Sequence, residues 1–348
     1  MARGIRRALP GAEVVTIPMS DGGEGFVEAL LLSIGGATTA VSVGGPDGRP
    51  LEASFAALAD GRLAVETSAA SGLQLVPNER RDALAATSRG TGELIAAILG
   101  RSGSGPRILC GLGGSAYTDG GTGAARAIGW RFLDAAGAEL PEGGGWLERL
   151  AAIDGDQVDA RIRGAEVVGV HDVDNPLLGA RGAARVFAPQ KGAGPRNVAV
   201  LERGLEVLAE RIEADLGMAV GDIPAGGASG GLGAGLVAFF GASLAPGFDL
   251  VASITGLEEE IRRSDLVLTG EGALDASSLG GKTPAGVGRL ALEAGVRCIA
   301  LSGIVEVSEA DLAGTGITLA VSLAERFGAD AARRDAAAVL EEAVAGIT

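Results

Sequence analysis

The last third of the chain alternates between strand-like and helix-like segments, and this alternation restricts the fold more than any other feature. Apolar runs at residues 265–269, 297–301 and 317–321 predict strands. Segments at residues 284–294, 308–313 and 334–344 predict helices between and after them. Successive parallel strands need long crossover connections, which are usually helices. The pattern therefore predicts a mostly parallel sheet with helices on its faces.

The first two thirds of the chain predict a more mixed arrangement. Residues 13–19 predict a short strand, residues 24–33 an amphipathic helix, and residues 38–67 a small antiparallel meander. Helices at 91–99, 124–128 and 196–216 and strands at 107–111 and 165–170 are expected further along. We therefore expect an α/β protein of two domains. Residues 1–36 and 256–348 would form a discontinuous parallel-sheet domain of doubly wound, flavodoxin- or Rossmann-like type, and residues 37–255 an inserted mixed α/β domain.

Charge and cysteine content narrow the possible partners. A formal net charge of -15 disfavours nucleic acid and anionic membranes, because no basic patch offsets it.

The uncharged stretch at residues 223–248 carries eight glycines and two prolines, which indicates a buried turn and helix and not a membrane span. Cys110 and Cys298 lie in apolar segments and read as reduced thiols. Without a secretory signal at the N-terminus, a cytoplasmic location is expected.

Only two of the 29 basic residues are lysines, Lys191 and Lys282, and both lie in glycine-rich turns. Codon bias toward arginine is the simplest explanation of that ratio. Under such a bias, a lysine that remains is more often one whose compact ammonium group is needed. We expect both lysines to contact an anion.

Five polar, glycine-rich segments stand where strands should end, at residues 19–25, 111–121, 172–176, 226–231 and 269–275. In open α/β sheets, ligands bind at the carboxyl ends of the strands, and glycine lets backbone N–H groups approach phosphate. The same segments carry acidic residues: Asp21, Glu24, Asp119, Asp172, Asp174, Glu271 and Asp275. Carboxylates beside phosphates need a Mg²⁺ ion or a reacting hydroxyl to offset repulsion. This combination predicts phosphoryl transfer, although any single glycine loop could be only a turn.

Common nucleotide-binding and hydrolase patterns do not fit. A phosphate-binding loop at Lys282 would need glycine where Ala276 stands. The dinucleotide pattern near Gly111 has Ala116 in place of its third glycine, which makes a nicotinamide dehydrogenase a poor alternative. A catalytic triad would depend on the single histidine, His171, which is as compatible with a packing role.

Taken together, these segments resemble the type I glycerate kinases. The matching stretches are Pro18-Met19-Ser20-Asp21-Gly22-Gly23-Glu24-Gly25, Thr87-Ser88-Arg89-Gly90-Thr91-Gly92-Glu93-Leu94-Ile95, Gly113-Gly114-Ser115 with Thr118-Asp119-Gly120-Gly121, Asp172-Val173-Asp174-Asn175-Pro176-Leu177, Phe187-Ala188-Pro189-Gln190-Lys191-Gly192-Ala193, and Thr269-Gly270-Glu271-Gly272 with Asp275 and Gly281-Lys282-Thr283-Pro284. They occur in the family's order over essentially the whole chain. Six segments in sequence are far more specific than any one of them.

The resemblance implies ATP- and Mg²⁺-dependent phosphorylation of D-glycerate, with 2-phosphoglycerate favoured over 3-phosphoglycerate and an active site in a cleft between two α/β domains. It assigns catalytic roles to Asp172, Lys191 and Asp275, with Asp172 or Asp275 holding Mg²⁺ or activating the substrate hydroxyl. The expected substrate- and nucleotide-binding residues are Asp21, Gly22, Gly23, Glu24, Gly113, Gly114, Ser115, Asp119, Asn175, Gly230, Glu271, Lys282 and Thr283. Small molecules are the expected partners, and a homo-oligomer is left open.

Two departures from the family pattern leave alternatives open. The family usually has arginine where this chain has Ala273, so the preferred substrate could be another small hydroxy acid, such as a sugar acid. The family also starts with a strand and a loop of the form Asp-Ser-Phe-Lys-Gly, whereas this chain starts inside the helix that follows. About 20 residues, including the first strand, would then be missing. A non-catalytic ATP- or acid-binding relative is the second alternative.

Overall fold

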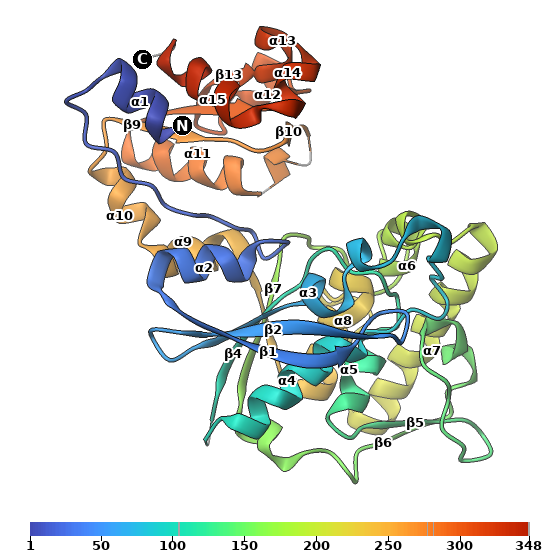
Figure 1. Ribbon diagram of the computed structural model, residues 1–348. Coiled ribbons are helices and arrows are strands. Elements are labelled where there is room, and N and C mark those ends of the chain that lie inside the picture. Colours follow the sequence, from blue (N-terminus) through green and yellow to red (C-terminus); the bar gives the residue numbers. More distant parts are fainter. Residues whose placement is uncertain (104, 277, 281, 347–348) are drawn as a thin grey trace. The chain divides into compact units, whose positions relative to one another are not determined.

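The computed structural model describes residues 1–103, 105–276, 278–280 and 282–346 (Figure 1). The chain forms two compact units, which we call the terminal unit (Met1–Asp21 with Phe248–Thr348) and the middle unit (Gly22–Gly247). The domains expected from the sequence were divided elsewhere, at residues 36 and 256. Helix α2 (Phe26–Ile34) belongs to the middle unit and most of α9 (Gly247–Thr255) to the terminal unit.

A parallel sheet forms the centre of the terminal unit. Strands β9 (Leu266–Thr269), β11 (Arg297–Ser302) and β13 (Ile317–Ser322) pair in the order β13-β11-β9. Two short strands, β10 (Ala273–Leu274) and β12 (Ile304–Val305), form a second parallel pair. The helices of this unit are α1 (Ala2–Ala8), α10 (Leu257–Arg262), α11 (Thr283–Ala294), α12 (Glu309–Leu312), α13 (Leu323–Phe327), α14 (Ala329–Arg334) and α15 (Ala336–Ala345). The parallel α/β pattern predicted for this part of the chain is confirmed.

Strand β11 shows why helices cover both faces of this sheet. Successive side chains of a strand point to opposite faces. Cys298 and Ala300 pack in one buried cluster with Leu290 of α11, whereas Ile299 and Leu301 pack in another with residues of α15 such as Val344. The apolar run at residues 298–301 of this strand is therefore buried on both sides, as its sequence predicts.

The strand predicted at residues 13–19 is wrong. These residues run without regular secondary structure, and β9 pairs only with β11 within the described part of the chain. Its apolar residues Ile17 and Met19 pack instead against the core of the terminal unit. Alternating apolar residues favour an extended chain, but a strand also needs a neighbouring strand to accept and donate its backbone hydrogen bonds.

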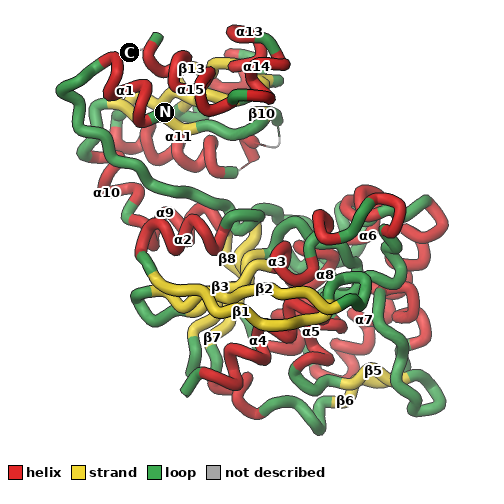
Figure 2. Tube along the Cα trace, in the orientation of Figure 1, coloured by secondary structure: helices red, strands yellow, loops and turns green. Residues whose placement is uncertain are grey.

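A mixed six-stranded sheet forms the centre of the middle unit (Figure 2). Its order is β1 (Gly36–Gly44), β2 (Pro50–Leu58), β3 (Leu63–Glu66), β4 (Arg107–Gly111), β7 (Glu166–His171) and β8 (Ser243–Pro246). Strands β1, β2 and β3 are antiparallel, which confirms the predicted meander. Strands β3, β4, β7 and β8 are parallel. A separate antiparallel pair joins β5 (Arg131–Leu133) and β6 (Ala152–Asp154).

Helices with apolar faces pack around this sheet. They are α3 (Thr67–Ser71), α4 (Arg89–Arg101), α5 (Thr122–Ala127), α6 (Ala183–Phe187), α7 (Pro195–Leu216) and α8 (Ala228–Phe240). Leu94, Ile95 and Ile98 of α4 are completely buried at the spacing of one helix face. Helix α8 covers much of the uncharged stretch of the sequence and is almost entirely buried. Among the described residues, no helix combines the length and apolar character needed to cross a membrane.

Candidate active site

Three neighbouring parallel strands of the middle unit end at the same edge of the sheet. Glu66 at the end of β3 is in register with Gly111 at the end of β4, and Gly111 is in register with Val170 near the end of β7. The chain then continues into Thr67, into the glycine loop at residues 111–121, and into His171 and Asp172. This edge is where an open α/β sheet binds ligands.

The loop that carries Gly113, Gly114 and Ser115 is anchored to α3. The Thr67 hydroxyl donates to the Gly113 carbonyl at 2.7 Å and accepts from the Gly113 N–H at 3.2 Å. The Gly114 carbonyl accepts from the N–H of Leu73 at 2.7 Å. Gly114 has a φ of +64°, a conformation that favours glycine. The predicted glycine loop is therefore held in one conformation by Thr67 and Leu73, which follow β3 in the chain.

The segment before α8 approaches the same loop. Ser229, Gly230 and Gly231 have φ values of +49°, +62° and +91°, so three successive residues are in the left-handed region. A Cβ atom on Gly230 would lie 2.1 Å from the carbonyl oxygen of Tyr117. The Ser229 hydroxyl lies 3.4 Å from that of Thr67. Glycine at 230 is thus required both by backbone conformation and by close packing on the chain that follows Ser115.

The glycines after Asp21 also lie at this edge. A Cβ on Gly22 would come within 2.7 Å of the Val170 carbonyl oxygen, and a Cβ on Gly113 within 2.5 Å of the Gly23 Cα atom. The carboxylate of Glu66 accepts the N–H groups of Gly25 and Val27, each at 2.9 Å. These bonds fix the start of α2, where a carboxylate also interacts favourably with the helix dipole. Glu24, in the same loop, is exposed.

Lys191 is one of the most deeply buried side chains of the middle unit, with 2% of its surface exposed. Its ammonium group donates to the Ser115 hydroxyl at 2.9 Å and to the Tyr117 carbonyl, and lies 5.6 Å from the centre of the Tyr117 ring. Burial lowers the pKa of Lys191 to about 7, against an opposite effect of the Asp119 carboxylate. The predicted anion-binding lysine therefore contacts the predicted loop serine directly.

Asp119 is completely buried, and its carboxylate holds neighbouring segments of the chain together. Its carboxylate accepts the N–H and hydroxyl of Ser88 at 2.8 and 2.9 Å, and the N–H groups of Gly121 and Gly123 at 3.0 and 3.2 Å. Burial raises the pKa of Asp119, and these hydrogen bonds lower it in part. The carboxylate joins the starts of α4 and α5, which indicates a positioning role.

The acidic segment after β7 is less enclosed. Asp172 and Asn175 are partly buried, and the Asn175 side-chain amide donates to the Arg181 carbonyl at 2.7 Å. The Asn175 backbone carbonyl accepts the N–H of Gly227 at 2.9 Å, which connects this segment to the start of α8.

Burial lowers the pKa of His171, and among the described residues no hydrogen bond links it to Ser115 or Ser229. A Ser–His catalytic pair therefore has no support.

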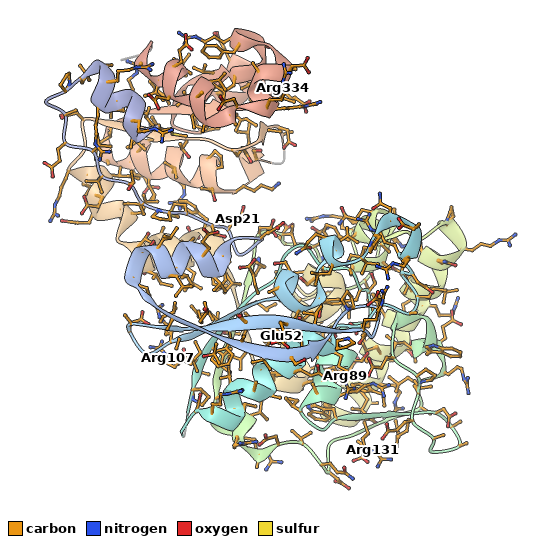
Figure 3. The ribbon with its side chains drawn as sticks, in the orientation of Figure 1. Asp21, Glu52, Arg89, Arg107, Arg131 and Arg334 are labelled. Carbon is orange, nitrogen blue, oxygen red and sulfur yellow. The ribbon has the colours of Figure 1, made fainter. Side chains whose placement is uncertain are left out.

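A second group of predicted residues lies in the terminal unit. Glu271 follows β9, and burial raises its pKa while the Lys282 charge lowers it. Asp275 and Asp21, which is labelled in Figure 3, act on Glu271 in the opposite sense to Lys282. The Asp275 carboxylate accepts the N–H of Ser278 at 3.0 Å.

The remaining predicted residues of this group stand at the start of α11. Lys282 is the residue before the helix and Thr283 its first residue, while Gly281, part of the predicted motif, lies outside the described residues. Asp21, Glu271, Asp275 and Lys282 thus form one charged cluster of the terminal unit.

Within the described residues, no group of three or more histidine, cysteine, aspartate or glutamate side chains is placed to bind a metal. Asp172 belongs to the middle unit and Asp275 to the terminal unit. Mg²⁺ usually takes one or two protein carboxylates and completes its shell with water and substrate phosphates. A single carboxylate such as Asp172 or Asp275 is compatible with that way of binding.

Sequence analysis missed Glu66, Thr67 and Ser71. Ser71 accepts the N–H of Thr91 at 3.2 Å and so ties α3 to α4. The available signal was the run of polar residues directly after the apolar strand at residues 63–65. Without glycine in that run, it did not resemble the other loops.

Comparisons with known proteins agree with one another. The model of the glycerate kinase family matches residues 1–348. A glycerate kinase from Halalkalibacterium halodurans is 42% identical over 347 residues, covering 99% of this chain and 91% of that protein. A glycerate 2-kinase from Escherichia coli K12 is 45% identical over 290 residues, covering 83% and 76%. The crystal structure of a protein assigned as glycerate kinase 2 from Salmonella typhimurium LT2 superposes with a TM-score of 0.83 at 37% identity, covering 99% and 91%.

Proposed function

The chain belongs to the glycerate kinase family, and we infer from this that it transfers the γ-phosphoryl group of ATP to D-glycerate, with 2-phosphoglycerate as the product. The Escherichia coli relative that supports the position of transfer is named for the 2-kinase activity. The match extends over the whole chain, so it includes the loops of both units.

The observation that carries this function in the structure is the convergence of glycine loops at one sheet edge. Gly22, Gly113 and Gly230 are each packed against neighbouring backbone so closely that a Cβ atom would clash. Backbone packed in this way can present N–H groups to phosphate oxygens without side chains in between. A kinase needs such groups because phosphoryl transfer depends mainly on positioning and charge stabilisation.

We assign roles to the predicted residues on this basis. Lys191 positions Ser115 and its loop through the hydrogen bond between them, and its charge stabilises negative charge that develops near that loop. Asp172, which follows β7 and is partly buried, is the candidate to accept the proton of the glycerate hydroxyl. Lys282 and Thr283 at the start of α11 would contact the phosphates of ATP. Asp275, in the same unit, would bind Mg²⁺ or activate the substrate hydroxyl.

We propose that Mg²⁺ binds together with ATP, because the phosphates of ATP bind a divalent cation. When bound, the ion would offset negative charge between the phosphate oxygens. We assign Asp172 or Asp275 to it, as a single ligand beside water and phosphate oxygens. Carboxylate oxygens are the ligand type that Mg²⁺ prefers.

A kinase for another small hydroxy acid is the alternative to a D-glycerate kinase. Ala273 is exposed in β10 and places no charge where the family usually has arginine. Without that positive charge, a small hydroxy acid such as D-glycerate would bind more weakly. A larger hydroxy acid would be affected less, because other residues could bind its additional hydroxyl groups. Another hydroxy acid kinase is therefore the second candidate, and a panel of sugar acids would identify it by a higher kcat/KM than D-glycerate gives.

The direct test is coupled ADP release with ATP, Mg²⁺ and D-glycerate, followed by NMR of the product. The expected result is turnover that yields 2-phosphoglycerate. Turnover that yields 3-phosphoglycerate would contradict the position of transfer. ATP binding without turnover of any hydroxy acid would identify a non-catalytic relative. A cytoplasmic location, consistent with the two free buried thiols at Cys110 and Cys298, and a homo-oligomeric state stay predictions.

A further inference from the structure

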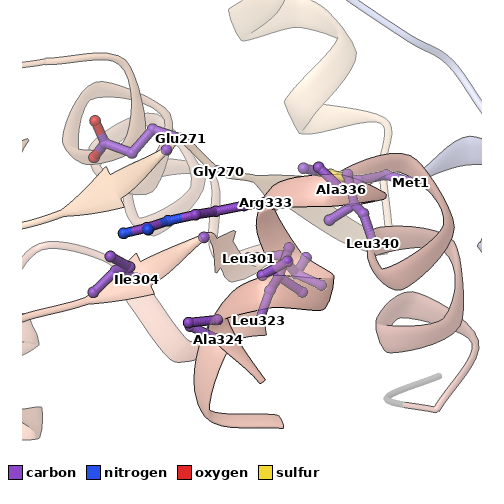
Figure 4. A pocket seen from close by; sticks show the side chains of 14 residues that line it. Met1, Gly270, Glu271, Leu301, Ile304, Leu323, Ala324, Arg333, Ala336 and Leu340 are labelled. Carbon is purple, nitrogen blue, oxygen red and sulfur yellow. The ribbon is translucent and has the colours of Figure 1, made fainter. Parts of the chain in front are cut away.

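Nucleophilic side chains are placed differently in the two units. The cavity of the terminal unit has a mainly aliphatic wall (Figure 4), and no serine, threonine, cysteine or lysine is among the described residues that line it. In the middle unit, a serine and a lysine meet at the edge of the sheet where the parallel strands end. This pair, Ser115 and Lys191, has the composition of a nucleophile and its base.

The two side chains are close enough for proton transfer. The Nζ atom of Lys191 lies 2.9 Å from the Oγ atom of Ser115, and the same Nζ atom donates to the backbone carbonyl of Tyr117. A neutral amine can keep the second bond as a donor and use its lone pair to accept the serine proton. The bond to Tyr117 therefore holds the amine beside Ser115 in both protonation states.

Lys191 loses its proton more easily than an ordinary lysine. Burial lowers its pKa to about 7, and the charge of the nearby Asp119 carboxylate acts in the opposite direction. Arg81 is also close, since its guanidinium donates to the backbone carbonyl of Gln190 at 3.4 Å. Within the described part of the chain, no carboxylate forms an ion pair with Lys191. Above neutral pH, the amine is therefore mostly neutral and available as a base.

Two backbone N–H groups at this serine are placed to bind an anion. Among the described residues, none accepts a hydrogen bond from the N–H of Gly114 or of Ser115, although the N–H groups on either side of them donate to Thr67 and Ser71. Ser115 is 7% exposed, and a buried N–H without an acceptor is uncommon. Gly114 is exposed and has a left-handed conformation, and successive N–H groups in such a turn bind anions. A phosphoryl group on Ser115 would provide the acceptor.

We propose that Ser115 is a nucleophile activated by Lys191 and accepts a phosphoryl group covalently. This inference rests on the proposed kinase function for the natural donor, ATP. It goes beyond that function by giving the enzyme a second phosphoryl acceptor, which competes with the hydroxy acid and reacts when the acid is absent.

The transfer to Ser115 exchanges one bond to phosphorus for another. The bond between the serine Oγ atom and the γ-phosphorus forms, and the bond between that phosphorus and the bridging oxygen breaks, so that ADP leaves with the electron pair. The serine proton moves to the amine of Lys191. The new ammonium group then lies beside the phosphoserine and stabilises its negative charge.

The first test examines Ser115 without ATP. Diethyl p-nitrophenyl phosphate reacts with an activated serine by forming an Oγ–P bond and releasing p-nitrophenolate, whose absorbance gives the rate. Peptide mass spectrometry is expected to find the label on Ser115. The rate should be half-maximal near pH 7 and constant above about pH 8.5, because only neutral Lys191 accepts the proton. A rate that still rises at about pH 10 would indicate hydroxide as the base and overturn the role of Lys191.

Three variants give matched comparisons for the same reagent. Ser115→Ala should abolish labelling. Lys191→Met should slow it at least about 100-fold, which is the size of a general-base contribution. Ser229→Ala is the control and should react within about twofold of the wild type. Ser229 is 9% exposed beside the same loop, and its hydroxyl lies near that of Thr67 and near no described lysine. The pH profile of the wild type does not depend on how any variant folds.

The second test uses ATP that carries a radioactive γ-phosphate. With Mg²⁺ and without a hydroxy acid, the label is expected on Ser115 of the wild type and is expected to be absent from Ser115→Ala. Added D-glycerate should lower the amount of labelled protein, because the acid competes for the phosphoryl group. Reaction with the aryl phosphate but not with ATP would overturn ATP as the donor to Ser115.

The outcomes separate this inference from the proposed function. Absence of label from both reagents, in protein that turns over D-glycerate, would overturn the activated serine and leave the kinase intact. Labelling in Lys191→Met at the wild-type rate would also overturn it, because the lysine would then not be the base. Labelling of Ser115 by the aryl phosphate in protein that phosphorylates no hydroxy acid would support the nucleophile and contradict the proposed function.

Discussion

At the scale of single residues, the two lysines have different environments. Lys191 is buried and bound to Ser115 and Tyr117, whereas Lys282 is partly buried at the start of α11. A buried ammonium group is costly because the low-dielectric interior disfavours its charge. Such a cost is tolerated where the charge or its hydrogen bonds are used, which fits the proposed role of Lys191.

Lys191→Met should change how stability depends on pH. Burial lowers the pKa of Lys191 from 10.5 to about 7, so between these values the unfolded chain binds more protons than the folded chain. The cost of burying Lys191 is complete below pH 7 and decreases as the pH rises. Wild-type stability should therefore increase relative to Lys191→Met by up to about 1.4 kcal/mol per pH unit. Urea unfolding at pH 7, 8 and 9 measures this, and parallel pH profiles would contradict it.

Asp119→Asn should destabilise the protein strongly. The carboxylate accepts four hydrogen bonds in a buried position, and an amide has only one oxygen to accept them while its NH₂ group faces N–H donors. The expected loss is about 2–4 kcal/mol in the free energy of unfolding. Asp174→Asn is the control, since Asp174 is exposed and pairs with Arg181 at 2.5 Å. It should cost at most about 0.5 kcal/mol, and similar losses in both variants would argue against the positioning role.

At the scale of elements, Glu66 links a strand to a helix. It ends β3, and its carboxylate binds the first N–H groups of α2 and the Ser68 hydroxyl at 2.8 Å. The loop with Gly22 and Gly23 precedes this helix and packs on the ends of β4 and β7. Glu66 therefore positions a glycine loop of the site without needing to contact a ligand.

Glu66→Gln should lower both stability and turnover. The amide loses the negative charge at the start of α2 and can accept at only one atom, so we expect a loss of about 1–2 kcal/mol. Turnover should decrease because the loop before α2 loses part of its anchor. Glu52→Gln, on the exposed side of β2, is the matched control and should change neither quantity (Figure 3). Chemical unfolding and ADP release measure the two effects, and normal turnover in Glu66→Gln would remove the proposed positioning role.

At the scale of the whole molecule, the placement of carboxylates bears on how the proposed Mg²⁺ ion would be bound. The described residues hold no cluster of three or more metal-binding side chains. A metal that binds mainly through the phosphates of ATP contributes nothing to the folding of the free protein.

Removal of divalent cations with EDTA should therefore abolish turnover and leave the melting temperature of the free protein within about 1 °C. Thermal unfolding followed by circular dichroism, with and without EDTA, measures the second quantity. Added Mg²⁺ should restore turnover fully. A fall in melting temperature after EDTA would instead indicate a structural metal site.

The sequence by itself determined the elements whose signal is local. The spacing of apolar residues predicted the parallel strands β9, β11 and β13, the meander of β1, β2 and β3, and the long helix α7, because helix and strand periods are properties of a short segment. The glycine loops could be predicted for a related reason. Glycine is favoured wherever backbone takes a positive φ or packs closely, as at Gly114 and Gly230.

Only the tertiary structure decided what depends on partners distant in sequence. Residues 13–19 have a strand-like pattern but no neighbouring strand, so they stay irregular. The hydrogen bonds that the Asp119 carboxylate accepts from Ser88 and from the start of α5 could not be predicted from its own glycine-rich segment. Glu66 carried no motif, yet it holds α2. Backbone pairing, burial and hydrogen bonding to residues far along the chain are set by which elements pack together, and no short segment contains that information.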